Sequence, residues 1–414
     1  MKTKVNISYS EKIVTWKTFI EQYSKHCKNL INTYERDLPF VMVYSSGTTG
    51  ASKGIVLTND GINATIANYI SPDFPYERGD RFLQMIPVWF STGLVLSCLM
   101  PLCLGITVVL EPVFNEQTFC HNLWKYKPAM TLVATSLWLA MIKDRKLQKT
   151  DMSFLKYPIT GGEQLLPRVE SVLDHFLAER NCQSVILQGW GMCELGGTVC
   201  TNTMKHNKSG SVGLPIKGVV VAAFDRKSNE ELKYNQRGEL RVMSPARMKH
   251  YYKNEEATNN YFYTDYKGRT WGCTGDIGYV DEDGDVFVLG RAEDIFTSQE
   301  GRKVYNFDIE NVIYQSGNVA QCEVVGLKTG QGYDVPVAHI IKESAYAGTD
   351  TELVQEIQEL CRKGLESDSI PRGYKICTSF PVKASGKRDM EKIQQERNGF
   401  VRVENGKLVE VDMK

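Results

Sequence analysis

The sequence predicts an α/β protein with two parts, and three observations lead to this prediction. The chain has 414 residues, of which 42% are apolar, which is enough to form the cores of more than one domain. Short strand-like runs alternate with amphipathic helical stretches in its first half. After about Gly210 the pattern changes to strands separated by turn signals. We therefore expect helices covering a largely parallel sheet, followed by a different, strand-rich region.

Several apolar runs are typical of buried strands, and helical stretches such as Pro167–Ala178 lie between them. These runs are FVMVYS from Phe40, ITVVL from Ile106, MTLVAT from Met130 and SVILQG from Ser184. The longest apolar stretch, from Gly93 to Leu110, has the length of a membrane span, but Pro101 and Gly105 interrupt it. We expect a buried helix, a turn and a strand there, and no membrane span.

The later part of the chain is predicted to contain more strands and a smaller second unit. Strands are expected in GVVVAAFD, GELRVM and YVDEDGDVFVLG, with a tight hairpin turn at Asp283-Gly284. The second unit begins near Arg291, which divides the chain into residues 1–290 and 291–414. Its expected elements are helices at Asn306–Gln315 and Thr351–Lys363, strands near Cys322–Leu327 and Val335–Ile341, and a polar tail.

Composition argues against several classes of function. Basic and acidic residues number 49 each, so no overall field attracts nucleic acid or an anionic membrane. The eleven cysteines and six histidines show neither C-x-x-C pairs nor ligand-like clusters, which predicts a reducing compartment and no structural metal. The N-terminal segment lacks an apolar core of signal-peptide length. We expect a cytoplasmic protein that acts on small molecules.

The most informative segment is YSSGTTGASKG, from Tyr44 to Gly54, which precedes a helical stretch beginning near Asn59. Its glycines let backbone N–H groups approach an anion, while hydroxyl groups and a lysine add donors and positive charge. It is not a Walker loop, because Ser52 replaces that loop's second glycine. A flexible surface loop is the alternative that composition leaves open. The candidate phosphate-binding residues are Ser45, Ser46, Gly47, Thr48, Thr49, Gly50 and Lys53.

This segment resembles the [YF]-[ST]-SGTTG-x-x-KG signature of the adenylate-forming superfamily, which includes acyl- and aryl-CoA ligases, luciferases and nonribosomal-peptide adenylation domains. The resemblance covers about residues 40 to 390. It implies a large multi-layer α/β ATP-binding domain with a distorted β-barrel-like part, followed by a small mobile α+β domain. Further motifs follow in the same order: GGEQ from Gly161, GWGMCE from Gly189, SVGLP from Ser211, GEL from Gly238, TGDIG from Thr274, GRAEDIF from Gly290 and SGK from Ser385.

The resemblance implies a nucleotide site beyond the phosphate loop. In it, Trp190 stacks on adenine, Asp276 accepts hydrogen bonds from the ribose hydroxyls, and Arg291 is a second nucleotide contact. Without the resemblance, a buried aromatic residue is more often part of a core, and a charged residue in a turn is more often solvated. The implied nucleotide-binding residues are Gly161, Gly162, Glu163, Gly189, Trp190, Gly191, Met192, Cys193, Asp276 and Arg291.

The resemblance also implies the residues that act during the reaction. Glu194 matches the acid that acts toward Mg²⁺ on ATP, and a hard cation beside phosphates does prefer carboxylate oxygen. Lys387 matches the mobile lysine that reaches the carboxylate and the α-phosphate. Glu293 falls at the hinge about which the small domain rotates. Alone, Lys387 would be read as a solvent-exposed lysine in a turn.

The substrate is expected to be a fatty or aromatic acid. Peptide-synthetase domains carry an Asp in the segment that corresponds to PVWFSTG, from Pro87 to Gly93, and none is present here. Because a buried ammonium without a carboxylate is unfavourable, this absence argues against amino acids. A glycine at position 191 is expected to deepen the acyl pocket. The family pattern gives that pocket as Trp89, Phe90, Trp138, Gly191 and Leu195.

The expected reaction is ATP-dependent activation of the acid as an acyl-adenylate, followed by transfer to the thiol of CoA or of a carrier-protein phosphopantetheine. The sequence leaves the choice of acceptor open. The phosphate loop begins near residue 44, whereas relatives precede it with a substantial subdomain, so we also expect a possible N-terminal companion chain. Amino-acid adenylation and an inactive nucleotide-binding partner subunit are the alternatives.

Overall fold

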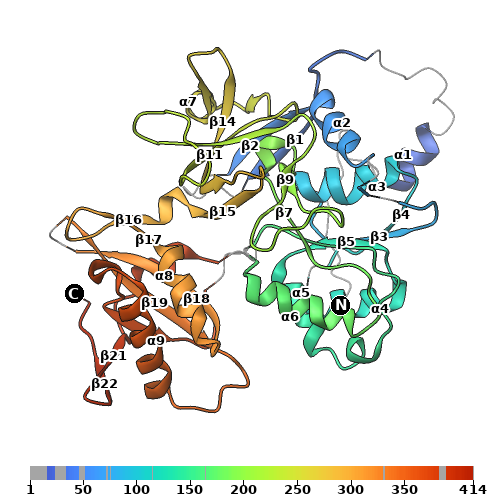
Figure 1. The fold of residues 1–414 in the computed structure, drawn as a ribbon. Helices are drawn as coiled ribbons and strands as arrows, with labels where there is room; N and C mark the ends of the chain where they lie inside the picture. Colours follow the sequence, from blue (N-terminus) through green and yellow to red (C-terminus); the bar gives the residue numbers. More distant parts are fainter. Residues whose placement is uncertain are drawn as a thin grey trace.

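The computed structural model has a mixed α/β fold with several sheets (Figure 1), so the fold class expected from the sequence is confirmed. Colours in Figure 1 run from the blue N-terminal part to the red C-terminal part, which lies to one side of the rest. The residues that the structure describes are 16–23, 34–45, 52–70, 73–74, 76–113, 115–163, 165–329, 332–381 and 388–413.

A seven-stranded sheet forms the centre of the larger part, and its first five strands are parallel. The runs expected from Ile106 and Met130 form strands, as does the end of the run from Ser184, whereas β3 and β6 were not anticipated. In spatial order the strands are β4 (Thr107–Leu110), β3 (Arg81–Gln84), β5 (Met130–Val133), β6 (Tyr157–Thr160), β7 (Leu187–Trp190), β8 (Cys200–Thr201) and β9 (Leu214–Pro215).

Helices cover both faces of this sheet, and alternate strand residues supply two separate cores. On one face, Phe82 and Met130 pack with the helices α2 and η1. On the other face, Leu83 and Val133 pack with α4, α5 and α6. A strand buried on both sides must be apolar at consecutive positions, which explains the unbroken apolar runs. The helices are α2 (Asn59–Asn68), α4 (Glu116–Tyr126), α5 (Thr135–Lys143) and α6 (Pro167–Ala178), besides a short α1 (Trp16–Tyr23).

The long apolar stretch forms a helix, a turn and a strand, as predicted. It begins as the π-helical η1 (Thr92–Leu99) and continues as α3 (Met100–Cys103), with Pro101 in the first turn of α3. The proline lies where the π-helical hydrogen bonds of η1, such as that from the Met100 N–H to the Val95 carbonyl, give way to α3. Gly105 has a φ of +71°, which turns the chain into β4. Among the described residues, no helix has the length and apolar character needed to cross a membrane.

The strand before the phosphate loop differs from the prediction. The run from Phe40 forms β1 (Pro39–Ser45), which lies outside the parallel sheet and pairs antiparallel with an unanticipated strand, β2 (Lys53–Thr58). β12 (His250–Tyr251) pairs with the other edge of β2. Only one side of β1 faces the core, where Val43 is 3% exposed, and its other side carries exposed apolar residues. The prediction of a fully buried strand was therefore wrong.

The strands expected beyond Gly210 are present and form an antiparallel sheet. Here β14 (Thr270–Val280) pairs with β11 (Gly238–Met243), β13 (Phe262–Thr264) and β15 (Val286–Arg291), and β10 (Val220–Phe224) lies beyond β11. The described pairings make an open sheet, with α7 (Glu255–Tyr261) beside it. The expected hairpin is present, and its turn includes Gly284 with a φ of +90°.

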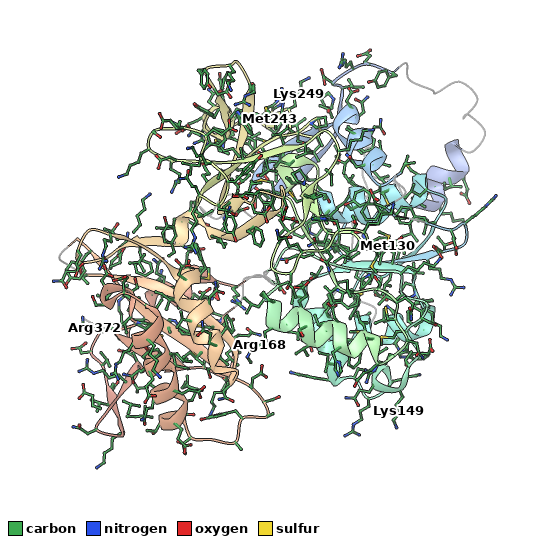
Figure 2. The ribbon with its side chains drawn as sticks, in the orientation of Figure 1. Met130, Lys149, Arg168, Met243, Lys249 and Arg372 are labelled. Atoms are coloured by element: carbon green, nitrogen blue, oxygen red, sulfur yellow. The ribbon has the colours of Figure 1, made fainter. Side chains whose placement is uncertain are left out.

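The C-terminal unit agrees closely with the expected helices and strands. Its helices are α8 (Asn306–Ile313), α9 (Asp350–Gly364) and α10 (Met390–Gln395). Arg168 on α6 reaches this unit and donates from Nη2 to the Val319 carbonyl at 2.9 Å (Figure 2). Its sheet, in spatial order, contains β18 (Val319–Lys328), β19 (Asp334–Lys342), β20 (Gly373–Ile376), β21 (Val401–Glu404) and β22 (Lys407–Glu410), and a separate hairpin joins β16 (Ile295–Thr297) to β17 (Lys303–Tyr305).

The tail was expected to be polar, and the structure adds a hairpin that was not anticipated. Residues 401–410 form the β21–β22 hairpin, which extends the sheet. Phe400, Val411 and Met413, which flank the hairpin, are buried and pack against Ile393 and Val325. Apolar residues on either side of a polar hairpin therefore fix the tail to the unit.

The exposed side of β1 leads to a first prediction. Phe40 and Tyr44 on this side are 54% and 52% exposed, and Met42 between them is 38% exposed. Contiguous apolar surface of this kind promotes association. We expect the chain to self-associate, and Phe40→Ser with Tyr44→Ser to reduce that association in light scattering.

Tyr266→Ser is the matched control, because Tyr266 is 90% exposed and lies in a loop away from β1. Its substitution is expected to leave the scattering unchanged. If the double variant scatters like the unmodified chain, the exposed side of β1 does not drive association.

Candidate functional site

Closely packed glycines form one wall of the candidate nucleotide site, at the ends of β6 and β7. A Cβ atom added to Gly161 would lie 3.2 Å from the Gly189 carbonyl oxygen, so these two backbones approach closely. Gly162 has a φ of +81°, which favours glycine. The Glu163 carboxylate that follows is exposed and accepts from the Ser136 N–H at 3.0 Å. The glycines of the GGEQ and GWGMCE motifs thus pack backbone against backbone, and their role beside a nucleotide stays a prediction.

Three residues predicted to contact the nucleotide lie together in the structure. Trp190 ends β7, and its indole Nε1 donates to Asp276 Oδ2 at 2.9 Å. The other oxygen of Asp276 accepts from Arg291 Nη1 at 2.6 Å. Asp276 and Arg291 are cross-strand partners on β14 and β15. Two segments far apart in the sequence therefore bring an aromatic ring, a carboxylate and a guanidinium to one place.

Burial and two hydrogen-bond donors act in opposite directions on the pKa of the Asp276 carboxyl. The residue is 8% exposed, and burial raises the pKa of its carboxyl, although Arg291 and the Trp190 indole oppose that shift. Arg291 also lies 3.8 Å from Glu293, the residue predicted at the hinge. A carboxylate with a cation on one oxygen is held in a fixed orientation, and such a group suits recognition of paired hydroxyls.

Glu194 lies in a short 3₁₀ turn, η3 (Cys193–Leu195), and is 7% exposed. Its backbone carbonyl accepts from the Met248 N–H at 2.6 Å, and its carboxylate Oε1 accepts from the Tyr251 hydroxyl at 2.8 Å. Among the residues that the structure describes, none forms an ion pair with this carboxylate. Met192, just before the turn, is half-buried and packs against two of the cores.

The carboxylate oxygens of Glu194 are suitable ligands for the magnesium ion that the resemblance implies. Mg²⁺ bound to a nucleotide needs only one or two protein carboxylates, since phosphate oxygens and waters supply the other ligands. The buried carboxylate of Glu194 offers this arrangement. It is linked through Tyr251 to Lys53, which lies at the end of the phosphate loop. The fit rests on the chemistry of Glu194 and on its place beside β2.

The central part of the phosphate loop lies outside the described residues, as does Lys387. The two ends of the loop are described, because Ser45 ends β1 and pairs with Lys53, which begins β2. The loop therefore connects two antiparallel strands. The predictions for Ser46, Gly47, Thr48, Thr49 and Gly50 stay predictions.

The residue after Lys387 is held in an ion-pair network that the sequence did not reveal. Arg388 donates from Nη1 to Glu323 on β18. Glu310 on α8 lies beneath this pair and accepts from the Val324 N–H at 2.8 Å. Burial and the neighbouring Glu323 raise the pKa of Glu310, and burial also raises the pKa of Asp294, next to the predicted hinge, to about 6. Arg388 thus pairs with Glu323 and acts on Glu310, whereas Arg291 is the cation that acts on Asp294.

Comparison with known proteins identifies the family. The profile of the AMP-binding enzyme family matches residues 3–252, and the profile of its C-terminal domain matches residues 308–387. The chain belongs to the AMP-binding enzyme family. The first match alone covers more than half of the chain.

Curated relatives of this family member include 4-coumarate–CoA ligases. A probable 4-coumarate–CoA ligase 1 of Dictyostelium discoideum is 29% identical over 336 residues, which are 78% of this chain and 60% of that protein. The 4-coumarate–CoA ligase of Pinus taeda is 29% identical over 355 residues, covering 83% and 63%. The chain thus spans less than two thirds of the length of these relatives.

Solved structures of the family share the fold. ATP-bound MatB from Rhodopseudomonas palustris superposes with a TM-score of 0.77 at 20% identity, covering 87% of this chain and 69% of that one. The anthranilate CoA ligase AuaEII in complex with anthranoyl-AMP gives a TM-score of 0.75 at 22% identity, covering 87% and 67%. These likenesses concern the fold alone.

Two of the predicted acyl-pocket residues belong to cores, which corrects the prediction. Trp138 is fully buried between helices, donates from Nε1 to the Ile159 carbonyl at 3.1 Å, and contacts the Phe119 ring edge-on. Leu195 is also fully buried and packs with Val199 and Leu240. Their side chains contribute to packing, because they are fully buried in two of the cores.

Gly191 lies against neighbouring backbone. A Cβ atom there would lie 2.0 Å from the Gly197 carbonyl oxygen, so neighbouring backbone fills the space beside this glycine. The glycine permits a close chain approach, and its effect on the depth of an acyl pocket stays a prediction. Trp89 and Phe90 remain accessible, since Trp89 is 66% exposed and Phe90 is half-buried, with ring centroids 6.3 Å apart.

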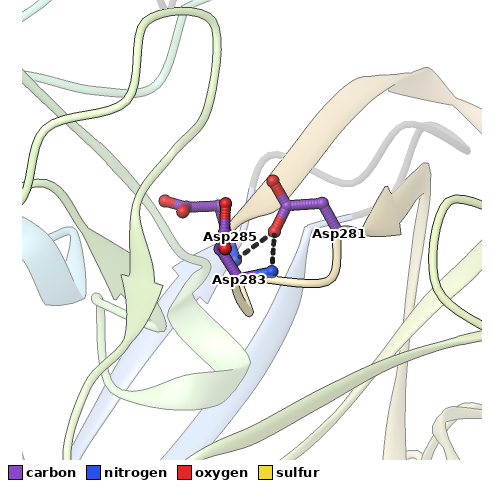
Figure 3. A group of neighbouring side chains, drawn as sticks. All are labelled: Asp281, Asp283 and Asp285. Atoms are coloured by element: carbon purple, nitrogen blue, oxygen red, sulfur yellow. Dashed lines mark hydrogen bonds between the residues drawn. The ribbon is translucent and has the colours of Figure 1, made fainter.

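A group of three aspartates in the β14–β15 turn resembles a metal site but has other partners. Asp281 accepts from the backbone N–H groups of Asp283 and Asp285 (Figure 3). Lys208 Nζ lies 2.5 Å from Asp281 and 2.8 Å from Asp283, and His206 Nε2 lies 2.9 Å from Asp285. Basic side chains therefore balance the acids, and the group stabilises the turn.

Sequence reasoning missed Tyr251 and Arg388, although both contact or adjoin candidate site residues. Tyr251 lies in the short strand β12, which belongs to none of the motifs that carry the resemblance. Arg388 directly follows the SGK motif, and its sequence neighbours give no sign of its partner Glu323 on β18.

The two predicted pocket tryptophans give a direct test of this correction. Trp138→Phe removes buried volume and the hydrogen bond to the Ile159 carbonyl, so we expect it to lower the free energy of unfolding by about 2 to 3 kcal/mol. Trp89→Phe is the matched control and should change it by less than about 0.5 kcal/mol. Urea denaturation of both variants measures the difference. Equal effects would place Trp138 outside the core.

Proposed function

We propose that the chain uses ATP to activate a carboxylic acid as an acyl-adenylate and then passes the acyl group to a thiol. The observation that carries this proposal is the grouping of Trp190, Asp276 and Arg291 at the end of the parallel sheet, with the buried Glu194 on an adjoining turn. Family membership supports the reaction type. Because the chain is shorter than its curated relatives, their activity is carried over here as a proposal.

The first step joins the acid to AMP. A carboxylate oxygen attacks the α-phosphorus of ATP, the bond from that phosphorus to the β-bridging oxygen breaks, and pyrophosphate leaves with the electron pair. The indole of Trp190 offers a stacking surface for adenine, and Asp276 accepts from the ribose hydroxyls. Lys53, the phosphate loop and Lys387 stabilise the charge on the phosphates. Magnesium at Glu194 would add further positive charge.

The second step transfers the acyl group. A thiolate attacks the carbonyl carbon of the acyl-adenylate, the bond between that carbon and the phosphate oxygen breaks, and AMP leaves. The thiol of CoA is the favoured acceptor, since curated relatives are named as CoA ligases. A carrier-protein phosphopantetheine would offer the same thiol. Competition between CoA and a phosphopantetheinylated carrier for supplied acyl-adenylate distinguishes these acceptors.

An aromatic acid is the substrate class that we favour. Relatives and structural neighbours are named for 4-coumarate and anthranilate, both of which are aromatic acids. In this chain, Trp89 and Phe90 offer accessible rings in the segment where an amino-acid-activating domain would carry an Asp. Amino-acid activation remains the second candidate among enzymes.

We also propose that the chain divides at residues 290 and 291, and that Glu293 acts as a hinge. The two family matches fall on either side of this boundary, which supports it.

A companion polypeptide that covers the exposed side of β1 is a further proposal, supported by the exposed Phe40 and Tyr44. A stable, fully active monomer in light scattering would contradict the companion. A cytoplasmic location remains a prediction, to be checked by cell fractionation.

The reaction is tested by measuring pyrophosphate release across a panel of acids. We expect aromatic or medium-chain acids to stimulate release from ATP, and α-amino acids to have little effect, because the buried ammonium would lack a carboxylate partner. Asp276→Asn serves as a negative control that should weaken release. Stimulation by α-amino acids alone would favour the second candidate, and no release with any acid would favour an inactive nucleotide-binding subunit.

Lys387 separates the two half-reactions. Its ammonium is proposed to bridge the incoming carboxylate and the α-phosphate, so Lys387→Ala should slow acyl-AMP formation by about 10²- to 10³-fold. The same variant should still convert supplied acyl-AMP and thiol to thioester, since the small domain turns away for that step. Stopped-flow measurement of each half-reaction tests this expectation.

The control is Lys392→Ala, because Lys392 is 67% exposed in the same unit and lies close to the same segment. That variant should retain both half-reactions. Equal loss of both steps in the Lys387 variant would rule out alternation between two domain positions.

A further inference from the structure

Tyr251 is a buried side chain that contacts two parts of the proposed phosphate site. It is 6% exposed, and its hydroxyl donates to Glu194 Oε1 at 2.8 Å. The Nζ atom of Lys53 lies 5.2 Å from the centroid of its ring, within the range of a cation–π contact. One tyrosine thus joins the predicted magnesium ligand to the lysine at the end of the phosphate loop.

The backbone around Tyr251 holds it firmly in place. Tyr251 pairs with Ile55 across β12 and β2, and the next N–H, of Tyr252, donates to the Gly54 carbonyl at 2.7 Å. Met248, before β12, donates to the backbone carbonyl of Glu194 at 2.6 Å. The same short segment therefore contacts both β2 and the turn that carries Glu194. Movement of either contact would shift the carboxylate relative to the loop.

The chemistry of the hydroxyl suits a permanent donor. The phenol carries one O–H donor, and the 2.8 Å contact with Glu194 Oε1 gives that donor a carboxylate acceptor. Donation to Oε1 orients the carboxylate, and an oriented ligand loses less freedom when it binds a cation. The ring edge also meets Tyr261, with centroids 6.1 Å apart, so packing restricts the ring itself.

We propose that Tyr251 is a positioning residue for magnesium-bound ATP, which orients the Glu194 carboxylate through its hydroxyl and Lys53 through its ring. This inference rests on the proposed function, because it assumes that Glu194 acts toward magnesium. It adds to that function a residue outside the motifs that carry the family resemblance. Adenine and ribose contacts do not depend on it, since they belong to Trp190 and Asp276.

Tyr251→Phe isolates the hydroxyl, because the ring and its packing with Tyr261 remain. Calorimetric titration of the full chain with ATP, with and without Mg²⁺, and with AMP gives a readout that does not depend on activity. We expect affinity for AMP, and for ATP without Mg²⁺, to stay within about two-fold of the unmodified chain. The gain in ATP affinity that Mg²⁺ provides should fall by about ten-fold, as expected for the loss of one hydrogen bond to a charged group.

Matched variants separate positioning from folding. Tyr252→Phe changes the neighbouring tyrosine, which is 49% exposed, and should leave all three affinities unchanged. Glu194→Gln should remove the magnesium-dependent gain. If Tyr251→Phe keeps the full gain while Glu194→Gln loses it, the inference about Tyr251 is wrong and the proposed magnesium site stands. If Tyr251→Phe weakens AMP binding equally, its role is structural, which also overturns the inference.

Failure of the underlying function would look different. If the unmodified chain shows no magnesium-dependent gain, or if Glu194→Gln keeps it, then the magnesium site itself is misassigned and the inference falls with it. Tyr251→Phe therefore decides the inference only when the unmodified chain and the Glu194 variant behave as proposed.

Discussion

The arrangement of the candidate site depends on one buried carboxylate, that of Asp276. A charge removed from water is unfavourable unless it is paired, and Asp276 satisfies both of its oxygens through Arg291 and Trp190. Trp190 lies 86 residues before Asp276 in the sequence, so this contact ties the end of the parallel sheet to the antiparallel sheet. The proposed nucleotide site would draw residues from both sheets, and this pairing holds those residues together.

Tight backbone contacts around the end of β7 support the same arrangement. Gly161 approaches Gly189 tightly, and Gly191 approaches Gly197 so closely that no side chain fits there. Glu194 follows directly, and Tyr251 connects it to β2 and Lys53. The site thus consists of short turns held between sheets, with few mobile side chains. Such preorganisation favours stabilisation of charge that develops during phosphoryl transfer.

Much of this fold could be predicted from the sequence, and the failures have physical reasons. Unbroken apolar runs predicted β5 and part of β7, because strands buried on both faces are apolar throughout. The apolar run from Phe40 led to the wrong prediction of a fully buried strand, because apolar composition does not show whether a second layer covers the strand. The β21–β22 hairpin was missed although its sequence signals it, because Val401 and Val403 alternate with polar residues and Asn405-Gly406, both with positive φ, forms the turn.

The candidate site was predictable only where a motif carries it. Trp190, Asp276 and Arg291 were expected to act together, and the structure brings them together. Trp138 was wrongly expected in a pocket, because residue type does not reveal which way a helix faces. Tyr251 carries no motif that reasoning from the residues could have singled out, because its importance comes from a contact across 57 residues of sequence.

The most direct test of an acyl-adenylate follows the carboxylate oxygen. An acid labelled with ¹⁸O in both carboxylate oxygens should be incubated with the chain, ATP, Mg²⁺ and a thiol, and the products examined by mass spectrometry. Attack of the carboxylate on the α-phosphorus transfers one labelled oxygen to AMP, which keeps it when the thioester forms. The proposed function predicts AMP with one ¹⁸O and unlabelled pyrophosphate. Label in inorganic phosphate, with ADP as the other product, would contradict it.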